Sequence, residues 1–178
     1  TASQNTAVGY TAMRGNTTGT RNLAIGYQAY RNSDTENDNL AIGYQAMTTN
    51  TAGGSKNTAI GNYAADALTS GDKNTAVGHL ALSTNTTAEN STAVGADALL
   101  TNDGSNNTGI GTNALKLSTT GTQNVAVGHN ALTANTTASQ NTAVGQESLK
   151  ANTTGTANVA VGAEALKANT TADNNTAV

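Results

Sequence analysis

A short pattern of small and β-branched residues recurs along the whole chain. The stretch Asn-Thr-Ala-Val-Gly at Asn5–Gly9 is followed by nine further complete copies, and an eleventh copy stops at Val178. Most copies begin 17 residues apart (22 − 5 = 17), with one spacing of 18 (57 − 39) and one of 16 (107 − 91). The copies begin at Asn5, Asn22, Asn39, Asn57, Asn74, Ser91, Asn107, Asn124, Asn141, Asn158 and Asn175. Such a fixed period indicates one structural unit stacked many times.

The repeated stretch predicts a short strand at the start of each unit. We number positions in a unit p1 to p17 from the Asn. Position p4 is β-branched in every copy, p3 is Ala except at Gly109, and p5 is Gly in every complete copy. This pattern is typical of a strand closed by Gly. Because p2 and p4 share one face and are the bulkier pair, we expect them to face inward.

A second strand is predicted at p8–p11, where a small residue at p8 precedes a larger one at p9. We expect p9 to pack inside against p2 and p4, and Ala at p3 and p8 to form ladders on the outer faces. The residues predicted to face inward include Leu23, Ile25, Tyr30, Val77, Leu82, Val127, Leu132, Val161 and Leu166. The substitution Val127→Asp is then expected to cost more than about 3 kcal/mol, because it would bury an unpaired charge.

The remainder of each unit predicts turn. An Asn-Thr-Thr pattern at p12–p14, often followed by Gly, is typical of turns, and it interrupts any helix every 17 residues. Stacked units rise about 4.8 Å each, so ten give a rod about 50 Å long. Position p1 is Asn in every copy except Ser91, which predicts an internal amide ladder between coils. The predicted fold is therefore an all-β parallel β-solenoid or β-roll, with about ten coils, two short strands per coil and one array over residues 1–178.

Composition agrees with a core that is only one or two side chains deep. Apolar residues make up 36% of the chain and charged residues 11%, with no Phe, Trp or Pro. These values exclude a thick globular core, whereas a solenoid needs only a thin one. The net charge of −3 provides no basic stripe for nucleic acid. No apolar run approaches 18 residues, so we expect no membrane insertion, and the absence of Cys excludes disulfides.

Two forms of the motif resemble repeats of known surface proteins. Asn-Leu-Ala-Ile-Gly (Asn22–Gly26, Asn39–Gly43) and Asn-Val-Ala-Val-Gly (Asn124–Gly128, Asn158–Gly162) resemble the head repeats of trimeric autotransporter adhesins. The fuller unit, Asn-Thr-Ala-Val-Gly-x-x-Ala-Leu-x-x-Asn-Thr-Thr-Gly, is similar to repeat arrays of phage tail fibres. The resemblance implies a left-handed roll, a trimer, and a location outside the cell, on a cell surface or on a virion. The period of 17 is longer than the adhesin-head coil.

Few side chains indicate chemistry. His79 and His129 both lie at p6, three coils or about 14 Å apart, which is too far to share a metal. Asp34, Glu36 and Asp38 could offer oxygen ligands to Ca²⁺, but no other coil repeats the set, and a solvated corner is the favoured interpretation. No Ser-His-acid set converges on one position. We therefore expect neither an enzyme nor a cofactor.

Two side-chain columns are candidates for surface binding. Tyr10, Tyr27 and Tyr44 occupy p6 in consecutive coils and Tyr63 follows at p7, which predicts either a plain exposed stack or a strip that binds sugars. The Thr pairs at p13–p14 resemble in part the ladders of ice-binding solenoids. That Thr ladder is interrupted at Asp34–Thr35, Thr51–Ala52, Thr69–Ser70 and Asp103–Gly104.

The function expected from these features is a non-enzymatic structural rod, either a fibre shaft or part of an adhesin or tail fibre. An ice-binding solenoid and a glycan-binding surface are the alternatives. Residues 1–4 match residues 137–140, the tail of an interior unit, and the last copy stops within a strand. Neither end carries a cap, so we expect a segment of a longer fibre. The predicted partner is the chain itself, in a parallel trimer packed through the Ala ladders or in a single-chain filament.

Overall fold

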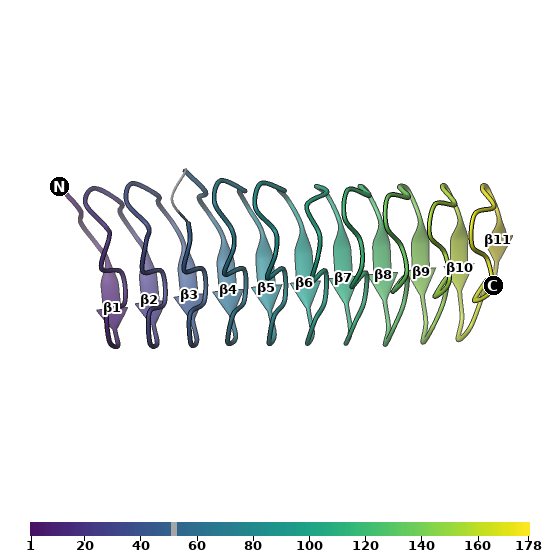
Figure 1. The fold of residues 1–178 in the computed structure, drawn as a ribbon, viewed down its shortest axis with the longest axis horizontal. Helices are drawn as coiled ribbons and strands as arrows, with labels where there is room; N and C mark the ends of the chain where they lie inside the picture. Colours follow the sequence, from purple (N-terminus) through teal and green to yellow (C-terminus); the bar gives the residue numbers. More distant parts are fainter. Residues whose placement is uncertain (51–52) are drawn as a thin grey trace.

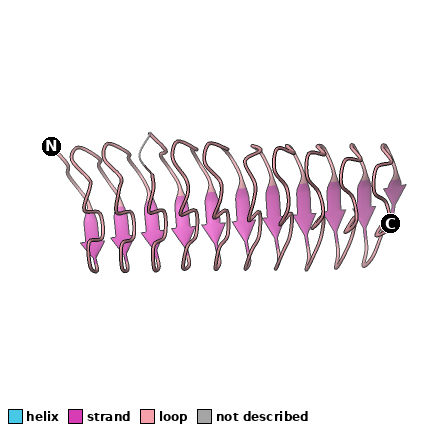
Figure 2. Ribbon diagram, in the orientation of Figure 1, coloured by secondary structure: helices cyan, strands magenta, loops and turns pink. Residues whose placement is uncertain are grey.

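The computed structural model describes residues 1–50 and 53–178. Each coil contributes one strand to a single sheet whose strands are all parallel and follow chain order. The strands are β1 (Thr6–Val8), β2 (Leu23–Ile25), β3 (Leu40–Ile42), β4 (Thr58–Ile60), β5 (Thr75–Val77), β6 (Thr92–Val94), β7 (Thr108–Ile110), β8 (Val125–Val127), β9 (Thr142–Val144), β10 (Val159–Val161) and β11 (Thr176–Ala177). They lie side by side along a rod with the two ends of the chain at opposite ends (Figure 1). The predicted parallel β-solenoid is confirmed, and Figure 2 shows the described residues without a helix.

Equivalent residues of successive coils lie directly beside one another. Ala24 pairs with Ala41, for example. The same register is kept across the 18-residue spacing, where Leu40 pairs with Thr58, and across the 16-residue spacing, where Thr92 pairs with Thr108. The extra and the missing residue are therefore absorbed in the turns and leave the sheet unbroken.

The sheet presents the opposite face to the core from the one predicted. Ala at p3 and p8 is buried, with Ala24 and Ala29 both at 0% exposure, whereas p4 side chains are outside, with Ile25 37% exposed. The expectation that p2 and p4 face inward was wrong, and so was the placement of the Ala ladders on outer faces. Of the residues predicted inside, Leu23, Ile25, Val77, Val127 and Val161 lie on the outward face, Tyr30, Leu82 and Leu132 are buried, and Leu166 is partly buried.

The narrow interior explains this orientation. A methyl group added at Gly109, the one p3 position without a side chain, would lie 3.2 Å from the carbonyl oxygen of Ala114 and 3.2 Å from Cγ of Leu99. The space between the strand and the opposite side of the coil thus admits Ala but no larger side chain. Leu at p9 fills the remaining core, so bulk alone was a misleading guide to which face of the strand is inside.

The predicted second strand at p8–p11 does not form. Positions p7 and p9 adopt left-handed backbone, as in Gln28 (φ 55°) and Tyr30 (φ 53°), so the segment coils instead of extending. The chain must reverse here to close a narrow coil, and an extended segment would carry it away. Hydrogen bonds between coils continue all the same: the N–H of Tyr30 donates to the carbonyl of Ala46 at 2.9 Å.

The glycine at p5 ends each strand for a steric reason. Gly26 has φ +135°, and a Cβ on it would lie 2.3 Å from the carbonyl oxygen of Gly43 in the next coil. Real Cβ contacts are never that short, and L-residues avoid this region of φ. The column of p5 glycines therefore lets successive coils approach closely.

Candidate functional site

The most extensive polar feature is a column of buried p1 side chains. The backbone N–H of Asn22 donates to Oδ1 of Asn5 at 2.8 Å, and the same bond recurs from coil to coil as far as Asn175. In each complete coil that begins with Asn, the side-chain amide also donates to a carbonyl near the end of the same coil, as from Asn57 to Gly71 at 2.8 Å. The predicted internal amide ladder is confirmed. At Ser91 the hydroxyl takes over, accepting from the N–H of Asn107 at 3.3 Å.

A second column of side-chain acceptors, which sequence analysis missed, lies at p16 and its equivalents. The N–H of Thr20 donates to Oδ1 of Asn37 at 2.8 Å, and that of Thr122 donates to Oγ of Ser139 at 3.0 Å. The signal was present in the sequence, because short polar residues occupy this position in almost every coil. These side chains satisfy backbone donors that turns otherwise leave to solvent.

The p12 side chains form a third column, which is interrupted. In the C-terminal coils Nδ2 of Asn152 donates to Oδ1 of Asn135 at 3.2 Å, and Asn169 bonds Asn152 in the same way at 3.0 Å. Other coils carry Ser33, Leu68 or Ser118 at p12. Four buried side-chain atoms without a hydrogen-bond partner lie at or beside these substitutions, namely Asn16 Oδ1, Asn50 Oδ1, Asn85 Nδ2 and Ser118 Oγ.

The acidic corner predicted to be solvated contains one buried carboxylate. Glu36 is 2% exposed. Its Oε2 accepts from the N–H groups of Asp34 (2.7 Å) and Thr35 (3.0 Å), and its Oε1 accepts from that of Gly53 (3.0 Å). The prediction of a solvated corner was therefore wrong for Glu36, which binds backbone donors beside the 18-residue spacing. Asp34 is exposed, and Asp38 is turned to another partner.

That partner is Arg21, whose guanidinium binds Asp38 at 2.6 Å and 2.9 Å from the preceding coil. Hydrogen bonding from Arg21 holds the pKa of Asp38 below its ordinary value. The three acidic residues thus do not converge on a common point. Within residues 1–50 and 53–178, no group of three or more His, Cys, Asp or Glu side chains is placed to hold a metal ion.

A carboxylate also compensates for the 16-residue spacing. Oδ1 of Asp103 accepts from the N–H groups of Thr86 (3.0 Å), Thr87 (2.9 Å) and Ala88 (3.3 Å). In a regular coil the corresponding donors meet a backbone carbonyl, as Thr119 meets that of Thr136 at 2.8 Å. Partial burial raises the pKa of Asp103, but the bonds from Thr87 and Thr86 outweigh it, and the pKa is lowered. Asp103 therefore substitutes for a peptide carbonyl of the regular coil.

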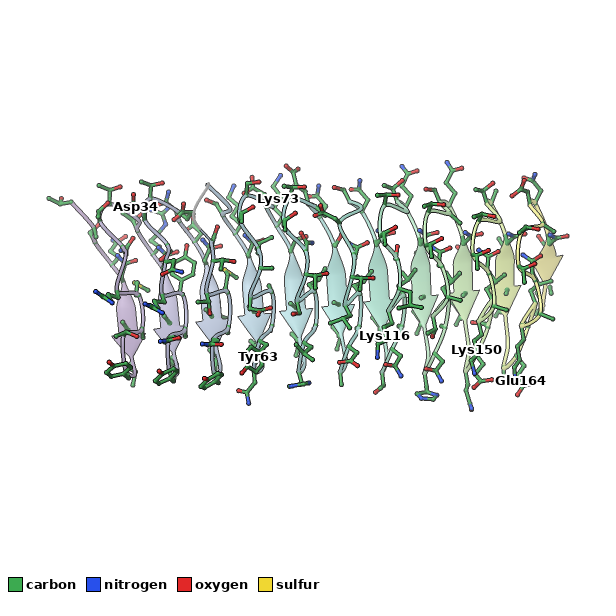
Figure 3. All side chains as sticks on the ribbon, viewed as in Figure 1. Asp34, Tyr63, Lys73, Lys116, Lys150 and Glu164 are labelled. Carbon is green, nitrogen blue, oxygen red and sulfur yellow. The ribbon has the colours of Figure 1, made fainter. Side chains whose placement is uncertain are left out.

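The tyrosine column forms as predicted along one edge. The rings of Tyr10 and Tyr27 lie 5.3 Å apart at 14°, and those of Tyr27 and Tyr44 lie 5.1 Å apart at 6°. Tyr63 meets Tyr44 edge-on at 66°, and His79 meets Tyr63 at 86°. Figure 3 shows Tyr63 on the edge opposite Asp34 and Lys73. Because stacked rings cover each other's faces, a sugar would meet mainly ring edges and hydroxyl groups; binding stays a prediction.

The Thr ladder at p13–p14 has few free hydroxyl groups at p13. Oγ1 of Thr119 donates to the carbonyl of Thr136 at 3.1 Å, and Thr136 bonds Thr153 in the same way at 3.2 Å. These hydroxyl groups donate to the next coil, so their protons are not available for hydrogen bonds to ice. The interruption at Thr51–Ala52 lies outside the described residues.

His79 and His129 are exposed, as their turn position predicted.

The outward face of the sheet runs along the strands β1 to β11 with a uniform chemistry. It carries two columns without a charged residue. The p2 column is Thr6, Leu23, Leu40, Thr58, Thr75, Thr92, Thr108, Val125, Thr142, Val159 and Thr176. The p4 column is Val8, Ile25, Ile42, Ile60, Val77, Val94, Ile110, Val127, Val144, Val161 and Val178. Several p4 side chains are more than a third exposed, among them Val8 (58%) and Ile110 (40%).

The site features define a parallel β-solenoid repeat protein held together by polar side-chain columns. No pocket is found in the part of the chain that the structure describes. None of the described residues forms a helix long and apolar enough to cross a membrane. Comparison with protein-family models, with curated proteins and with solved structures gives no match.

Proposed function

We propose that this chain is a non-enzymatic structural shaft that works as a homo-oligomer. It would form part of a fibre, adhesin or tail fibre that holds a binding tip away from a virion or a cell surface. The observation that carries the proposal is the outward face of the sheet. Its two columns, p2 and p4, contain only Thr, Val, Ile and Leu over eleven rungs.

The size and uniformity of this face favour burial against a partner. A strip three residues wide and eleven strands long measures about 10 Å by about 50 Å. That is comparable with the largest apolar patches on single chains, which often mark interaction sites. The faces of parallel sheets are normally covered by other parts of a protein, and these columns carry no charged residue that would oppose such a contact.

The spacing of the rungs favours a second copy of the chain as that partner. Side chains can interdigitate on every rung only with a surface that repeats at the same rise of about 4.8 Å. Another copy presents this period over the same length. We propose a parallel trimer about the long axis, packed through the p2 and p4 columns. The Ala ladders are inside each coil and take no part in the contact.

The polar columns suit a shaft mechanically. The p1 bonds link consecutive coils from Asn5 to Asn175 and run along the rod axis. Tension along the rod would be shared among many such bonds and the hydrogen bonds of the sheet. The tip, and any ligand, would then lie outside this segment.

Sedimentation of wild-type protein, Val127→Asp and Thr137→Asp tests the proposal. Val127 lies on the outward face and Thr137 on an exposed corner, so both substitutions add one charge to a surface. We expect the wild type and Thr137→Asp to associate and Val127→Asp to sediment as a monomer near 17.7 kDa with an unchanged circular dichroism spectrum. A wild type that stays monomeric at micromolar concentration would refute the proposal.

Ice binding is the alternative that one further observation favours. Thr58, Thr75, Thr92 and Thr108 form an uninterrupted column on the flat outward face. This alternative predicts that the wild type is a monomer and shows thermal hysteresis, and that a Thr75→Ala and Thr92→Ala double variant loses the hysteresis. Such results would support ice binding in place of the shaft. Loss of sugar binding in Tyr27→Ala would instead favour the glycan-binding alternative.

A further inference from the structure

We propose that the tyrosine column is a site of oxidative cross-linking, at which neighbouring rings couple into a dityrosine that joins two coils covalently. The column consists of Tyr10, Tyr27 and Tyr44. Their ring centroids lie 5.3 Å and 5.1 Å apart, and the side chains are 68%, 42% and 40% exposed. This inference is independent of the proposed shaft function, since the bond forms within one chain.

The backbone holds the three rings on consecutive rungs. The N–H of Gln28 donates to the carbonyl of Tyr10, and that of Gln45 donates to the carbonyl of Tyr27, both at 2.9 Å. A radical formed on one ring therefore has the ring of a second tyrosine of the same chain beside it. Such positioning raises the effective concentration of the second ring far above that of another chain in dilute solution.

Formation of a dityrosine removes two electrons and needs an oxidant of the peroxide class, which a peroxidase uses to oxidise the rings. Each of two tyrosines loses one electron and its phenolic proton, which gives two phenoxyl radicals. The radicals join through the ring carbons next to the hydroxyl groups, and one carbon–carbon bond forms. The two ring protons at these carbons then move to the oxygens and restore both hydroxyl groups. Hydrogen peroxide accepts the two electrons and two protons and leaves as two water molecules.

The position of the column outside the core permits the ring movement that coupling needs. The new bond forms between π orbitals that stand perpendicular to the ring planes, so the stacked rings present the right faces and the edge-on ring of Tyr63 does not. The two joined rings must then turn relative to each other as the bonded carbons lose their ring protons. The p6 corner carries Asn62, Ala96 or Thr112 in other coils, so the coil itself does not require an aromatic ring there. Turning a p6 ring thus displaces no core side chain.

Tyr30 provides an internal contrast. It lies at p9 with 0% exposure, where its hydroxyl accepts from Nδ2 of Asn39 at 2.5 Å. Burial raises the pKa of its hydroxyl. A buried ring held in this way is shielded from an oxidant in solution, so modification should be confined to the exposed column.

Treatment of dilute protein with horseradish peroxidase and hydrogen peroxide tests the inference, in the wild type, Tyr27→Phe and Tyr63→Phe. Tyr27 belongs to both stacked pairs, whereas Tyr63 lies outside them. We expect dityrosine fluorescence, monomer mobility on a denaturing gel, and a cross-linked peptide that contains Tyr27. The yield should fall about tenfold or more in Tyr27→Phe and stay unchanged in Tyr63→Phe.

Three results would overturn the inference. One is a product that forms only between chains. Another is a yield in Tyr27→Phe equal to that of the wild type. The third is a cross-link that maps mainly to Tyr44 and Tyr63. Because folding is read separately by circular dichroism, and chain association by the gel and by sedimentation, each of these results leaves the shaft proposal to its own test.

Discussion

Oδ1 of Asn107 accepts a hydrogen bond of 2.9 Å from the backbone N–H of Asn124 in the next coil. Nδ2 of Asn107 meanwhile donates to the carbonyl of Gly121 at 2.6 Å, within its own coil. One side chain thus closes its coil and binds the following one. Since both residues are buried, no water can replace these bonds, and the repeat of Asn at p1 follows from this double requirement.

The first prediction concerns Asn124, which has the same role one coil further on. Asn124→Ala removes the acceptor of the N–H of Asn141, now bonded at 3.0 Å. An unsatisfied buried donor costs about 1–3 kcal/mol, so unfolding in urea should occur at a lower concentration. Asn124→Ser should cost less, because Ser91 shows that a hydroxyl can accept at this position. The idea fails if Asn124→Ala costs no more than Thr137→Ala on the exposed corner.

The second prediction concerns the left-handed backbone that recurs in each coil. Gln123 is exposed and has φ 59°, a conformation that costs an L-residue about 1–2 kcal/mol. Gln123→Gly relieves this cost, which exceeds the entropy penalty of about 0.5–1 kcal/mol that Gly adds elsewhere. We expect a small gain in the free energy of unfolding, measured by urea denaturation.

Gln146 serves as the matched control for that substitution. It is also exposed, and it does not have positive φ. Gln146→Gly should therefore destabilise by about 0.4–1 kcal/mol, because Gly gives the unfolded chain more freedom to lose on folding. Equal effects of the two Gln-to-Gly changes would show that backbone strain at Gln123 has no influence on stability.

The third prediction concerns the interrupted p12 column. Oγ of Ser118 is buried without a partner, whereas Asn152 is bonded on both sides in the C-terminal coils. Ser118→Asn should extend the column, and each net hydrogen bond adds about 0.5–1.5 kcal/mol. We expect a higher urea midpoint for Ser118→Asn and a lower one for Asn152→Ser. A loss of stability in both variants would contradict this account.

The sequence allowed prediction of those features that depend on local chemistry. Val or Ile at p4 beside Gly at p5 indicated a strand and its end, and Asn at p1 indicated the ladder. The facing could not be derived, because alternation separates two faces without saying which is inside. That choice depends on the narrow space around Gly109, which only the closed coil reveals.

The irregular coils show a second limit of sequence analysis. Asp103 and Glu36 look like surface acids in the sequence. In the structure each carboxylate accepts hydrogen bonds from backbone N–H groups of another turn, which the sequence does not place nearby. Their presence beside the 16- and 18-residue spacings was the available signal. The left-handed backbone at p9, as in Leu132 (φ 50°), had no signal in the sequence. Leu rarely adopts this conformation, so its presence there does not suggest it.

The last prediction concerns pH and Glu147. Its carboxylate binds Nζ of Lys150 at 2.8 Å and Nζ of Lys167 at 2.7 Å, and the second pair joins two coils. Hydrogen bonds from Lys150 and then Lys167 lower the pKa of Glu147 to about 2, from an ordinary value of 4.5. A carboxyl whose pKa is depressed on folding stabilises the fold above the unfolded value. This contribution is lost as the pH falls from about 4.5 to about 2.

Carbon-detected NMR titration of the Glu147 carboxyl measures this pKa directly. We expect a midpoint near 2 in the wild type and a higher one in Lys167→Met, which leaves a single lysine partner. Lys73→Met removes the same charge from a distant coil and should leave the midpoint unchanged. Because Glu147 is near the surface, salt should weaken the pairs and raise the midpoint. A wild-type Glu147 that titrates at its ordinary value, or a midpoint that Lys167→Met does not move, would show that these ion pairs do not join the coils in solution.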